Sequence, residues 1–254
     1  MRVTTVTVLT PCLPSKADHL EACANSVQRA KDALPALDIE WVLVFDGPGE
    51  ALAPSVADTV LRVPHQRGVS AARNYGLGAS AGSVVIPLDS DDEIDPSGLE
   101  RAVALLESEA DLGWIACNRL LTTGERTFHW HGDRAWEPGQ VAAEWSAPMQ
   151  FHANTLVLRT SLITQIGGWP ALGACEDLFL ALRLGEISRG ASISDVLVHY
   201  RAWPGQATRA ASFRTEQSLA YDFIERSIND ARRLSMRHPI ESPRPLGGLG
   251  SVPV

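Results

Sequence analysis

A dense group of carboxylates stands in the middle of the chain, directly after an apolar segment. Asp89, Asp91 and Asp92 follow the apolar run Val84–Leu88, which is typical of a buried strand. Carboxylates at the end of such a strand converge at one rim of a sheet. Hard divalent cations take oxygen ligands there, commonly one or two carboxylates together with substrate phosphate oxygens. The pattern therefore suggests a Mg²⁺ or Mn²⁺ site, and a solvated acidic loop is the alternative.

A second acidic pair, Glu176 and Asp177, comes before the helical pattern Leu178–Leu184. A carboxylate within hydrogen-bond reach of a hydroxyl can accept its proton as a general base, and a neighbouring carboxylate can orient it. An acidic start to a helix, favoured by the helix dipole, is the structural alternative. The pair is therefore a candidate for proton transfer.

Strands and helices alternate in the sequence pattern that must position these residues. We expect strands over Val3–Thr10, Ile39–Phe45, Thr59–Val63, Val84–Leu88, Leu112–Asn118, Thr155–Arg159 and Ile193–Tyr200. We expect helices over Asp18–Leu34, Ser70–Ala79, Pro96–Glu109, Ser161–Ile166, Glu176–Leu184 and Phe213–Leu234. This alternation predicts an α/β fold with a mostly parallel central sheet flanked by helices. Three strands end in Thr10, Asp46 and Asp89, so ligands are expected at that rim.

Composition excludes several classes of protein. The chain has 254 residues, 45% of them hydrophobic, and a net charge of −8, which argues for a globular protein without nucleic-acid partners. No apolar run approaches the ~18–20 residues of a membrane span, so we expect no integral membrane segment and a cytoplasmic location. The four widely spaced cysteines are expected to be reduced thiols. Residues 238–254 are rich in Pro and Gly, which predicts a mobile tail.

Five motifs in order give the chain a resemblance to a known family. They are the strand before Thr10-Pro11, the strand before Asp46-Gly47, Arg67-Gly68-Val69-Ser70-Ala71-Ala72-Arg73-Asn74, Leu88-Asp89-Ser90-Asp91-Asp92, and a downstream set. That set is Gly167-Gly168-Trp169-Pro170, Glu176-Asp177-Leu178 and His199-Tyr200-Arg201, followed by Pro204-Gly205-Gln206. Residues 3–210 resemble inverting family 2 glycosyltransferases of the GT-A fold. The resemblance implies transfer of a sugar from a nucleoside-diphosphate donor, UDP by default, to an unidentified acceptor.

The resemblance also implies roles for single residues. The loop at Thr10 and Pro11, with Asp46, would hold the nucleotide base, and Arg67 or Arg73 would lie near the base or diphosphate. Asp89 would face the ribose, and Asp91 would bind Mn²⁺ or Mg²⁺, with His199 as a further metal ligand. Asp177 would be the catalytic base beside Glu176, and Trp169 would line the acceptor or donor-sugar pocket. Phe45 and Pro48 depart from the family pattern around Asp46.

The domain division follows from the same resemblance. We expect one GT-A domain over residues 1–237, in which 1–110 form the nucleotide-binding half and 111–237 the acceptor and catalytic half. A sugar-1-phosphate nucleotidyltransferase is an alternative, although the segment Thr10–Pro14 lacks the Gly-rich loop of that class. A catalytically silent nucleotide-sugar-binding module is a third reading, and the oligomeric state is left open.

Overall fold

The computed structural model describes residues 4–122, 132–145 and 152–235, which form a mixed α/β fold. Its strands are β1 Thr4–Cys12, β2 Leu37–Asp46, β3 Thr59–Val63, β4 Val84–Pro87, β5 Glu93–Ile94, β6 Leu112–Leu121, β7 Arg134–Trp136, β8 Leu156–Arg159 and β9 Arg189–Tyr200. Its α-helices are α1 Leu20–Ala33, α2 Val69–Ala79, α3 Pro96–Ser108, α4 Gln140–Ala143, α5 Thr160–Gln165, α6 Glu176–Ile187 and α7 Phe213–Ser235. The short 3₁₀ helices are η1 Pro14–His19, η2 Ala153–Thr155 and η3 Ala207–Arg209. The expected fold class is confirmed.

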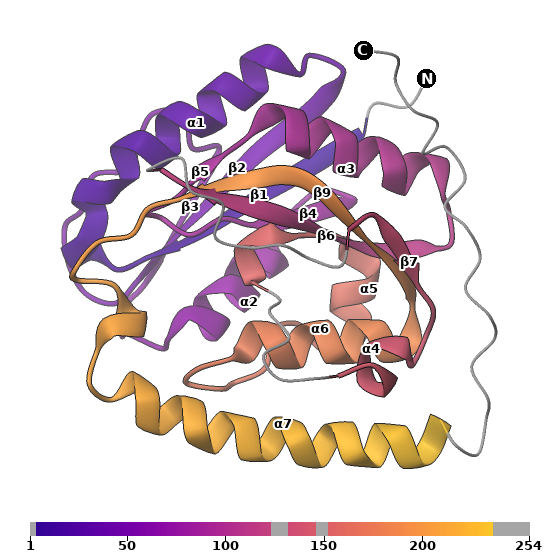
Figure 1. The fold of residues 1–254 in the computed structure, drawn as a ribbon. Coiled ribbons are helices and arrows are strands. Elements are labelled where there is room, and N and C mark those ends of the chain that lie inside the picture. The colour runs from indigo at the N-terminus through magenta and orange to yellow at the C-terminus, as the bar shows by residue number, and fades with distance from the viewer. Residues whose placement is uncertain (1–3, 123–131, 146–151, 236–254) are drawn as a thin grey trace.

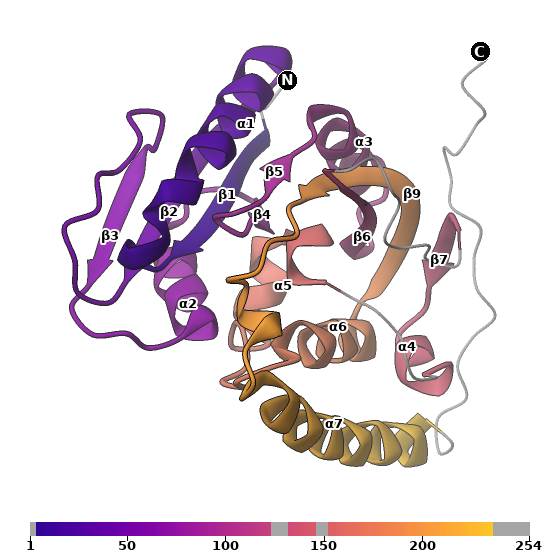
Figure 2. The same cartoon turned by 60° about the vertical axis from the view of Figure 1, so that its left-hand side comes forward.

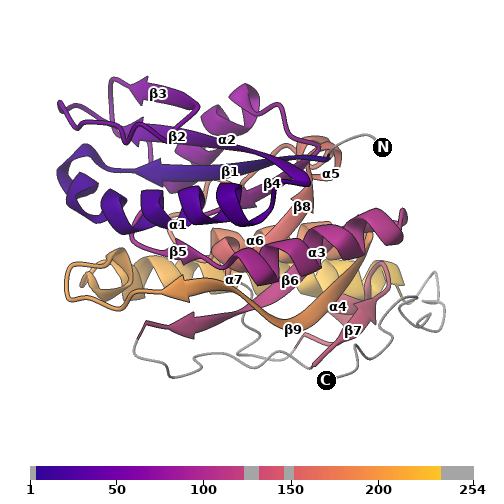
Figure 3. The same ribbon diagram turned by 90° about the horizontal axis from the view of Figure 1, so that it is seen from above.

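The strands form one sheet in the order β3-β2-β1-β4-β8-β6-β9-β5, with β7 paired to β9 (Figure 3). The strands β1 to β4 pair in parallel, as the alternating pattern predicts. In the second half β8 runs antiparallel to β4 and β6, and β5 and β7 run antiparallel to β9. The sheet is therefore parallel in its first half and mixed in its second, where only the β6–β9 pair is parallel.

Two apolar layers cover the sheet, one on each face. Helices α1 and α3 pack on one face, and α2, α5 and α6 lie on the other (Figure 1). Helix α7 forms a further layer against α4 and α6, away from the sheet (Figure 2). Helix α3 begins where the Asp95 side chain accepts hydrogen bonds from the backbone N–H groups of Ser97 and Gly98, with Pro96 in the first turn. The layers leave the carboxyl ends of β1, β2 and β4 open at one rim.

Some expectations on the chain as a whole are met in the described segments and others lie outside them. The four cysteines are buried free thiols, as expected. None of the helices in the described segments has both the length and the apolar composition that crossing a bilayer requires. The expected tail, residues 238–254, lies outside the described residues.

Helix α3 approaches β9 at Gly98, and this contact generates a prediction. A Cβ atom at Gly98 would lie 1.9 Å from the backbone oxygen of Val196. We therefore expect Gly98→Ala to lower the free energy of unfolding by about 1–3 kcal/mol, as overpacking does. Gly78→Ala in α2 is the matched control, because a Cβ there meets open space and alanine favours the helix. Denaturant unfolding measures both, and equal stability of the two variants would contradict the close approach.

Candidate active site

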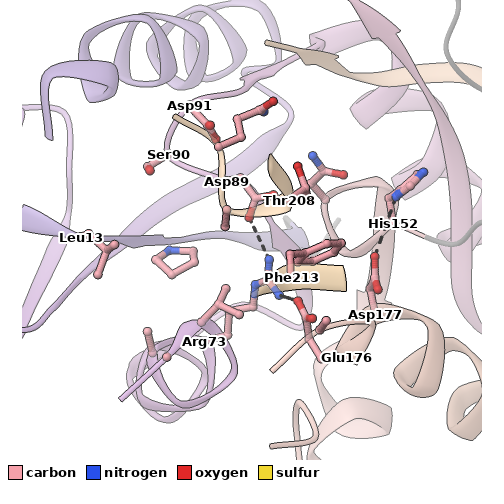
Figure 4. A pocket seen from close by; sticks show the side chains of 18 of the residues that line it. Leu13, Arg73, Asp89, Ser90, Asp91, His152, Glu176, Asp177, Thr208 and Phe213 are labelled. Carbon is pink, nitrogen blue, oxygen red and sulfur yellow. Dashed lines mark hydrogen bonds and ion pairs between the residues drawn. The ribbon is translucent and has the colours of Figure 1, made fainter. Parts of the chain in front are cut away.

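One cavity of about 770 Å³ lies at the rim where β1, β2 and β4 end. Its walls come from both halves of the chain. The first half supplies the ends of these strands, η1 and the start of α2. The second half supplies the start of α6, the segment after β9 and the first turns of α7. The acidic cluster and the acidic pair that the sequence singled out therefore face the same space (Figure 4).

Arg73 joins these two acidic groups. Its guanidinium donates from Nη2 to Asp89 Oδ1 at 2.8 Å and from Nη1 to Glu176 Oε1 at 2.9 Å (Figure 4). The Arg73 side chain is 2% exposed. Burial alone lowers the pKa of Arg73, but the charges of Asp89 and Glu176 outweigh it, so the net shift is upward. The arginine is thus a fixed cation between the end of β4 and the start of α6.

Asp91 lies in the same cavity and accepts one hydrogen bond from a neighbouring loop. The indole Nε1 of Trp203 donates to Asp91 Oδ2 at 2.6 Å. Trp203 in turn packs against the His19 ring, with 4.2 Å between ring centroids, and Lys16 Nζ lies 5.2 Å from its centroid. The loop after β9 is held over η1 in this way, and no residue of the described segments donates a hydrogen bond to the other oxygen of Asp91, Oδ1.

Asp92 is a buried residue that holds the loop next to the cavity in place. It is fully buried and accepts hydrogen bonds from Asn154 Nδ2 and, at 2.9 Å, from the backbone N–H of Arg201. Burial, followed by the charge of Asp89, raises the pKa of Asp92 well above its usual range. This carboxyl therefore joins the β4 loop to η2 and to the chain after β9, and it does not line the cavity.

Asp177 lies at the start of α6, where the chain turns sharply. The preceding Cys175 has a φ of 57°, the left-handed region that side chains rarely adopt. Asp177 Oδ1 accepts from the backbone N–H of Leu178 at 2.9 Å, and Oδ2 lies 3.8 Å from His152 Nδ1 (Figure 4). Burial, and then the charge of Arg119, lowers the pKa of His152 to about 3. His152 is therefore neutral at pH 7, and its contact with Asp177 is not an ion pair.

The expected base-binding residues are placed in different ways. Pro11 and Asp46 line the cavity, as does Arg73. The carboxylate of Asp46 accepts from the backbone N–H groups of Arg67 and Gly68, both at 2.8 Å, and so holds the loop before α2. Thr10 is buried and accepts from Trp41 Nε1 at 2.9 Å. Neither Thr10 nor the side chain of Arg67 belongs to the cavity wall, so direct contact with a base is not supported for them.

Two further predicted site residues lie outside the wall of this cavity. His199 Nε2 lies 2.9 Å from Asp95 Oδ2, beside the cap of α3, and does not line the cavity with Asp91. Burial tends to raise the pKa of Asp95, but hydrogen bonds from Ser97 and His199 lower it overall. Trp169 is 2% exposed and lies outside the cavity, and its backbone N–H and C=O pair with the side-chain amide of Asn74. Both residues have structural partners where ligand contact was expected.

Several cavity residues were not predicted from the sequence. Arg119 at the end of β6 and His152 before η2 line the wall next to Asp177, and Phe213, Gln217 and Tyr221 of α7 form another side. The amphipathic pattern predicts α7 itself, but it does not show which side chains meet a cavity. The expected strand over Leu112–Asn118 stops one residue before Arg119, so that pattern gave no signal for it.

The comparisons of the sequence and of the structure with known proteins point to the same kind of protein. Residues 7–170 match the model of the family described as Glycosyl transferase family 2. The putative glycosyltransferase EpsH of Bacillus subtilis (strain 168) is 35% identical over 183 residues, which are 65% of this chain and 52% of that protein. The chain thus spans about half the length of this curated relative.

Solved structures share the fold at low sequence identity. The S. aureus TarS 1-349 structure in complex with UDP-GlcNAc has a TM-score of 0.64 and 18% identity, and covers 85% of this chain and 65% of its own. A mannosyltransferase, PcManGT from Pyrobaculum calidifontis, in complex with GDP-Man and Mn²⁺, has a TM-score of 0.59 and 16% identity. It covers 94% of this chain and 76% of its own. At these identities the likeness carries the GT-A fold alone.

The Arg73 bridge generates a stability prediction. Arg73→Met keeps much of the side-chain volume but leaves two carboxylates without their cation, which is strongly destabilising in a buried site. We expect a loss of about 3 kcal/mol in the free energy of unfolding, at the low end of the usual range because Asp89 is partly exposed.

Arg183→Met is the matched control, since the Arg183–Glu186 pair lies at the surface and its loss costs about 1 kcal/mol at most. Denaturant unfolding at pH 7 measures both variants. A loss for Arg73→Met no larger than for Arg183→Met would mean that the buried bridge does not hold the two walls together.

Proposed function

Because the chain belongs to glycosyl transferase family 2, we propose that it transfers a sugar from a nucleoside-diphosphate donor, UDP-linked by default, to a hydroxyl or other nucleophilic acceptor. The transfer inverts the configuration at the sugar carbon and is assisted by a divalent metal. Residues 1–110 bind the donor nucleotide, and residues 111–237 supply the base and the acceptor wall. A nucleotidyltransferase is disfavoured by the family match.

One observation carries this proposal: carboxylates from two separate walls face a single cavity. Asp91 comes from the loop after β4, and Asp177 comes from the start of α6. An inverting displacement needs an attacking group and a leaving group on opposite sides of the reacting carbon. A base on one wall and a diphosphate site on another match that requirement. Arg73, between the walls, adds a positive charge close to the developing charge on the diphosphate.

The residues present fit a divalent metal held jointly with the donor. In the described part of the chain, no three His, Cys, Asp or Glu side chains form a metal cluster of their own. Mg²⁺ and Mn²⁺ need only one or two carboxylates when phosphate oxygens complete the shell. Asp91 would hold such a metal through Oδ1, with Asp89 nearby at the ribose. Bound there, the metal would neutralise the charge that builds on the diphosphate as the sugar leaves.

Asp177 is the better candidate for the base within the acidic pair. The carboxylate of Glu176 accepts a hydrogen bond from Arg73 Nη1 at 2.9 Å, so it is already engaged in a buried ion pair. Asp177 Oδ2 lies 3.8 Å from Nδ1 of His152, which is neutral at pH 7. In this arrangement Asp177 removes the proton from the acceptor hydroxyl as that oxygen attacks. Glu176 acts through Arg73 as a positioning residue.

Release of nucleoside diphosphate is the experiment that tests the function. The purified chain is incubated with UDP-sugars and Mn²⁺, with and without pools of hydroxyl acceptors, and free UDP is measured. A transferase releases UDP faster when an acceptor is present. A silent binding module binds UDP in a thermal-shift assay but releases none from the donor. A nucleotidyltransferase instead forms a nucleotide-sugar from a nucleoside triphosphate and a sugar 1-phosphate.

Asp177→Asn tests the base directly. The amide keeps the size and much of the hydrogen bonding but cannot accept the proton, so we expect kcat to fall by about 10²–10⁴-fold. Donor affinity stays within a few-fold, because the residue acts in the transition state. Asp222→Asn, on the exposed side of α7, is the matched control. Near-normal turnover of Asp177→Asn would remove this residue from the catalytic role.

Asp91→Ala tests the metal site. Calorimetric titration of UDP is run with Mn²⁺ and with EDTA, on both the wild type and the variant. We expect the wild type to bind UDP more tightly with Mn²⁺, and the variant to lose this gain, because the carboxylate shared with the metal is gone. Metal-independent UDP binding should change little. An unchanged gain from Mn²⁺ in the variant would place the metal ligand elsewhere.

A further inference from the structure

Arg119 is a cation in the cavity wall that forms no ion pair with a carboxylate of the described segments, although the charges of Asp92, Asp177 and Asp89 act on it. It lies near the end of β6 with its guanidinium 4.3 Å from the centroid of the Tyr200 ring. Its Nε is buried without a hydrogen-bond partner. In residues 4–122, 132–145 and 152–235, no hydrogen bond or ion pair engages its remaining nitrogens. The aromatic ring therefore orients a guanidinium whose donors are left for something else.

This arrangement differs from that of the other cations of the cavity. Arg73 is shared between two carboxylates, and Lys16 donates to the backbone oxygen of Gly205 at 2.9 Å. Burial lowers the pKa of Arg119, yet a guanidinium stays protonated in proteins. A half-buried guanidinium whose donors make no hydrogen bond is costly even with the charges of Asp92 and Asp177 acting on it, and an anion that accepts from those donors removes this cost. The free donors of Arg119 are thus the signature of a binding site for a ligand anion.

Arg119 lies on the same side of the cavity as Asp177, so an anion bound to Arg119 would lie near the proposed base. The charge of Arg119 acts on His152, and His152 lies 3.8 Å from Asp177. Asp91 belongs instead to the wall formed with Trp203 and η1. An anion on Arg119 therefore sits beside the base, where the transferred sugar and the acceptor meet. A carboxylate, with one negative charge, balances Arg119 without adding a surplus charge next to Asp177.

We propose that Arg119 binds a carboxylate carried by one of the two substrates, so that the chain handles an acidic sugar, either as the group transferred or as the acceptor. A planar guanidinium matches a carboxylate with two parallel hydrogen bonds, and the Tyr200 ring keeps the fork in place. The inference rests on the proposed glycosyl transfer, and it adds the chemical class of the substrate.

Calorimetric titrations of the wild type with Mn²⁺ present test the proposal. We first compare the affinities for UDP, UDP-glucose and UDP-glucuronate. The two sugars differ only at one carbon, where glucuronate carries a carboxylate in place of the hydroxymethyl group of glucose. Free glucose and free glucuronate are then titrated into the protein, with and without saturating UDP. A carboxylate on the donor predicts that UDP-glucuronate binds about 10–100-fold more tightly than UDP-glucose. If the acceptor carries the carboxylate, UDP-glucose and UDP-glucuronate should bind equally tightly. The UDP-loaded protein should then bind free glucuronate more tightly than free glucose.

Variants separate Arg119 from the rest of the site. Arg119→Gln removes the charge and should abolish the carboxylate preference while UDP affinity stays within a few-fold. Arg119→Lys keeps the charge without the fork and should keep part of the preference. Arg226→Gln, on the exposed side of α7, is the matched control. If Arg119→Gln does not fold, the wild-type titrations still decide whether the site prefers a ligand with a carboxylate.

The outcomes distinguish this inference from the proposed function. Failure to bind UDP would contradict the donor assignment, and the glucuronate titration without UDP would still test the anion site. Binding of UDP with no carboxylate preference in any titration would overturn the role of Arg119 alone. A preference that persists in Arg119→Gln would also overturn it, because another residue would then hold the carboxylate.

Discussion

The cavity depends on one buried cation shared between two carboxylates. Arg73 has almost no access to solvent, so Asp89 and Glu176 must lie within hydrogen-bond reach of it or its charge would be left uncompensated. Asp89 ends a strand of the first half of the chain, and Glu176 begins a helix of the second. The need to pair the charge therefore fixes the distance between the two walls. The unusual backbone at Cys175 is the local cost of bringing α6 into that position.

A further carboxyl, that of Asp92, restrains the same loop after β4. It accepts hydrogen bonds from Asn154 and from the backbone after β9, so the segment carrying Asp91 is held at both ends. The loop after β9 adds the indole of Trp203 from outside. Together with the Arg73–Asp89 pair, these three contacts make four polar connections between different elements, and they set where the strand-end carboxylates point. Preorganised groups of this kind can stabilise developing charge without rearranging during the reaction.

The sequence was informative where a residue's role depends on its own segment. The apolar run before Asp89 predicts a strand-end carboxylate, and helical spacing predicts α6 behind Asp177. It was uninformative where the role depends on a partner far along the chain. The resemblance implies His199 as a metal ligand, but its partner Asp95 lies 104 residues away along the chain, and the partners of Thr10 and Trp169 lie 31 and 95 residues away. The two- and three-residue strands β5 and β7 are too short to produce a periodic pattern.

The two walls of the cavity are attached by different kinds of force, and this has an evolutionary consequence. The wall proposed to bind the donor is fixed by charged and hydrogen-bonded groups whose geometry tolerates little change. Helix α7, which contributes Phe213, Gln217 and Tyr221, is attached through the buried apolar side chains of Ala220, Ile224 and Ile228. Apolar packing is non-directional and accepts volume-conserving substitution. Mutation can therefore remodel the α7 side of the cavity while the opposite wall is preserved, which gives lineages that keep one binding wall a route to new ligands.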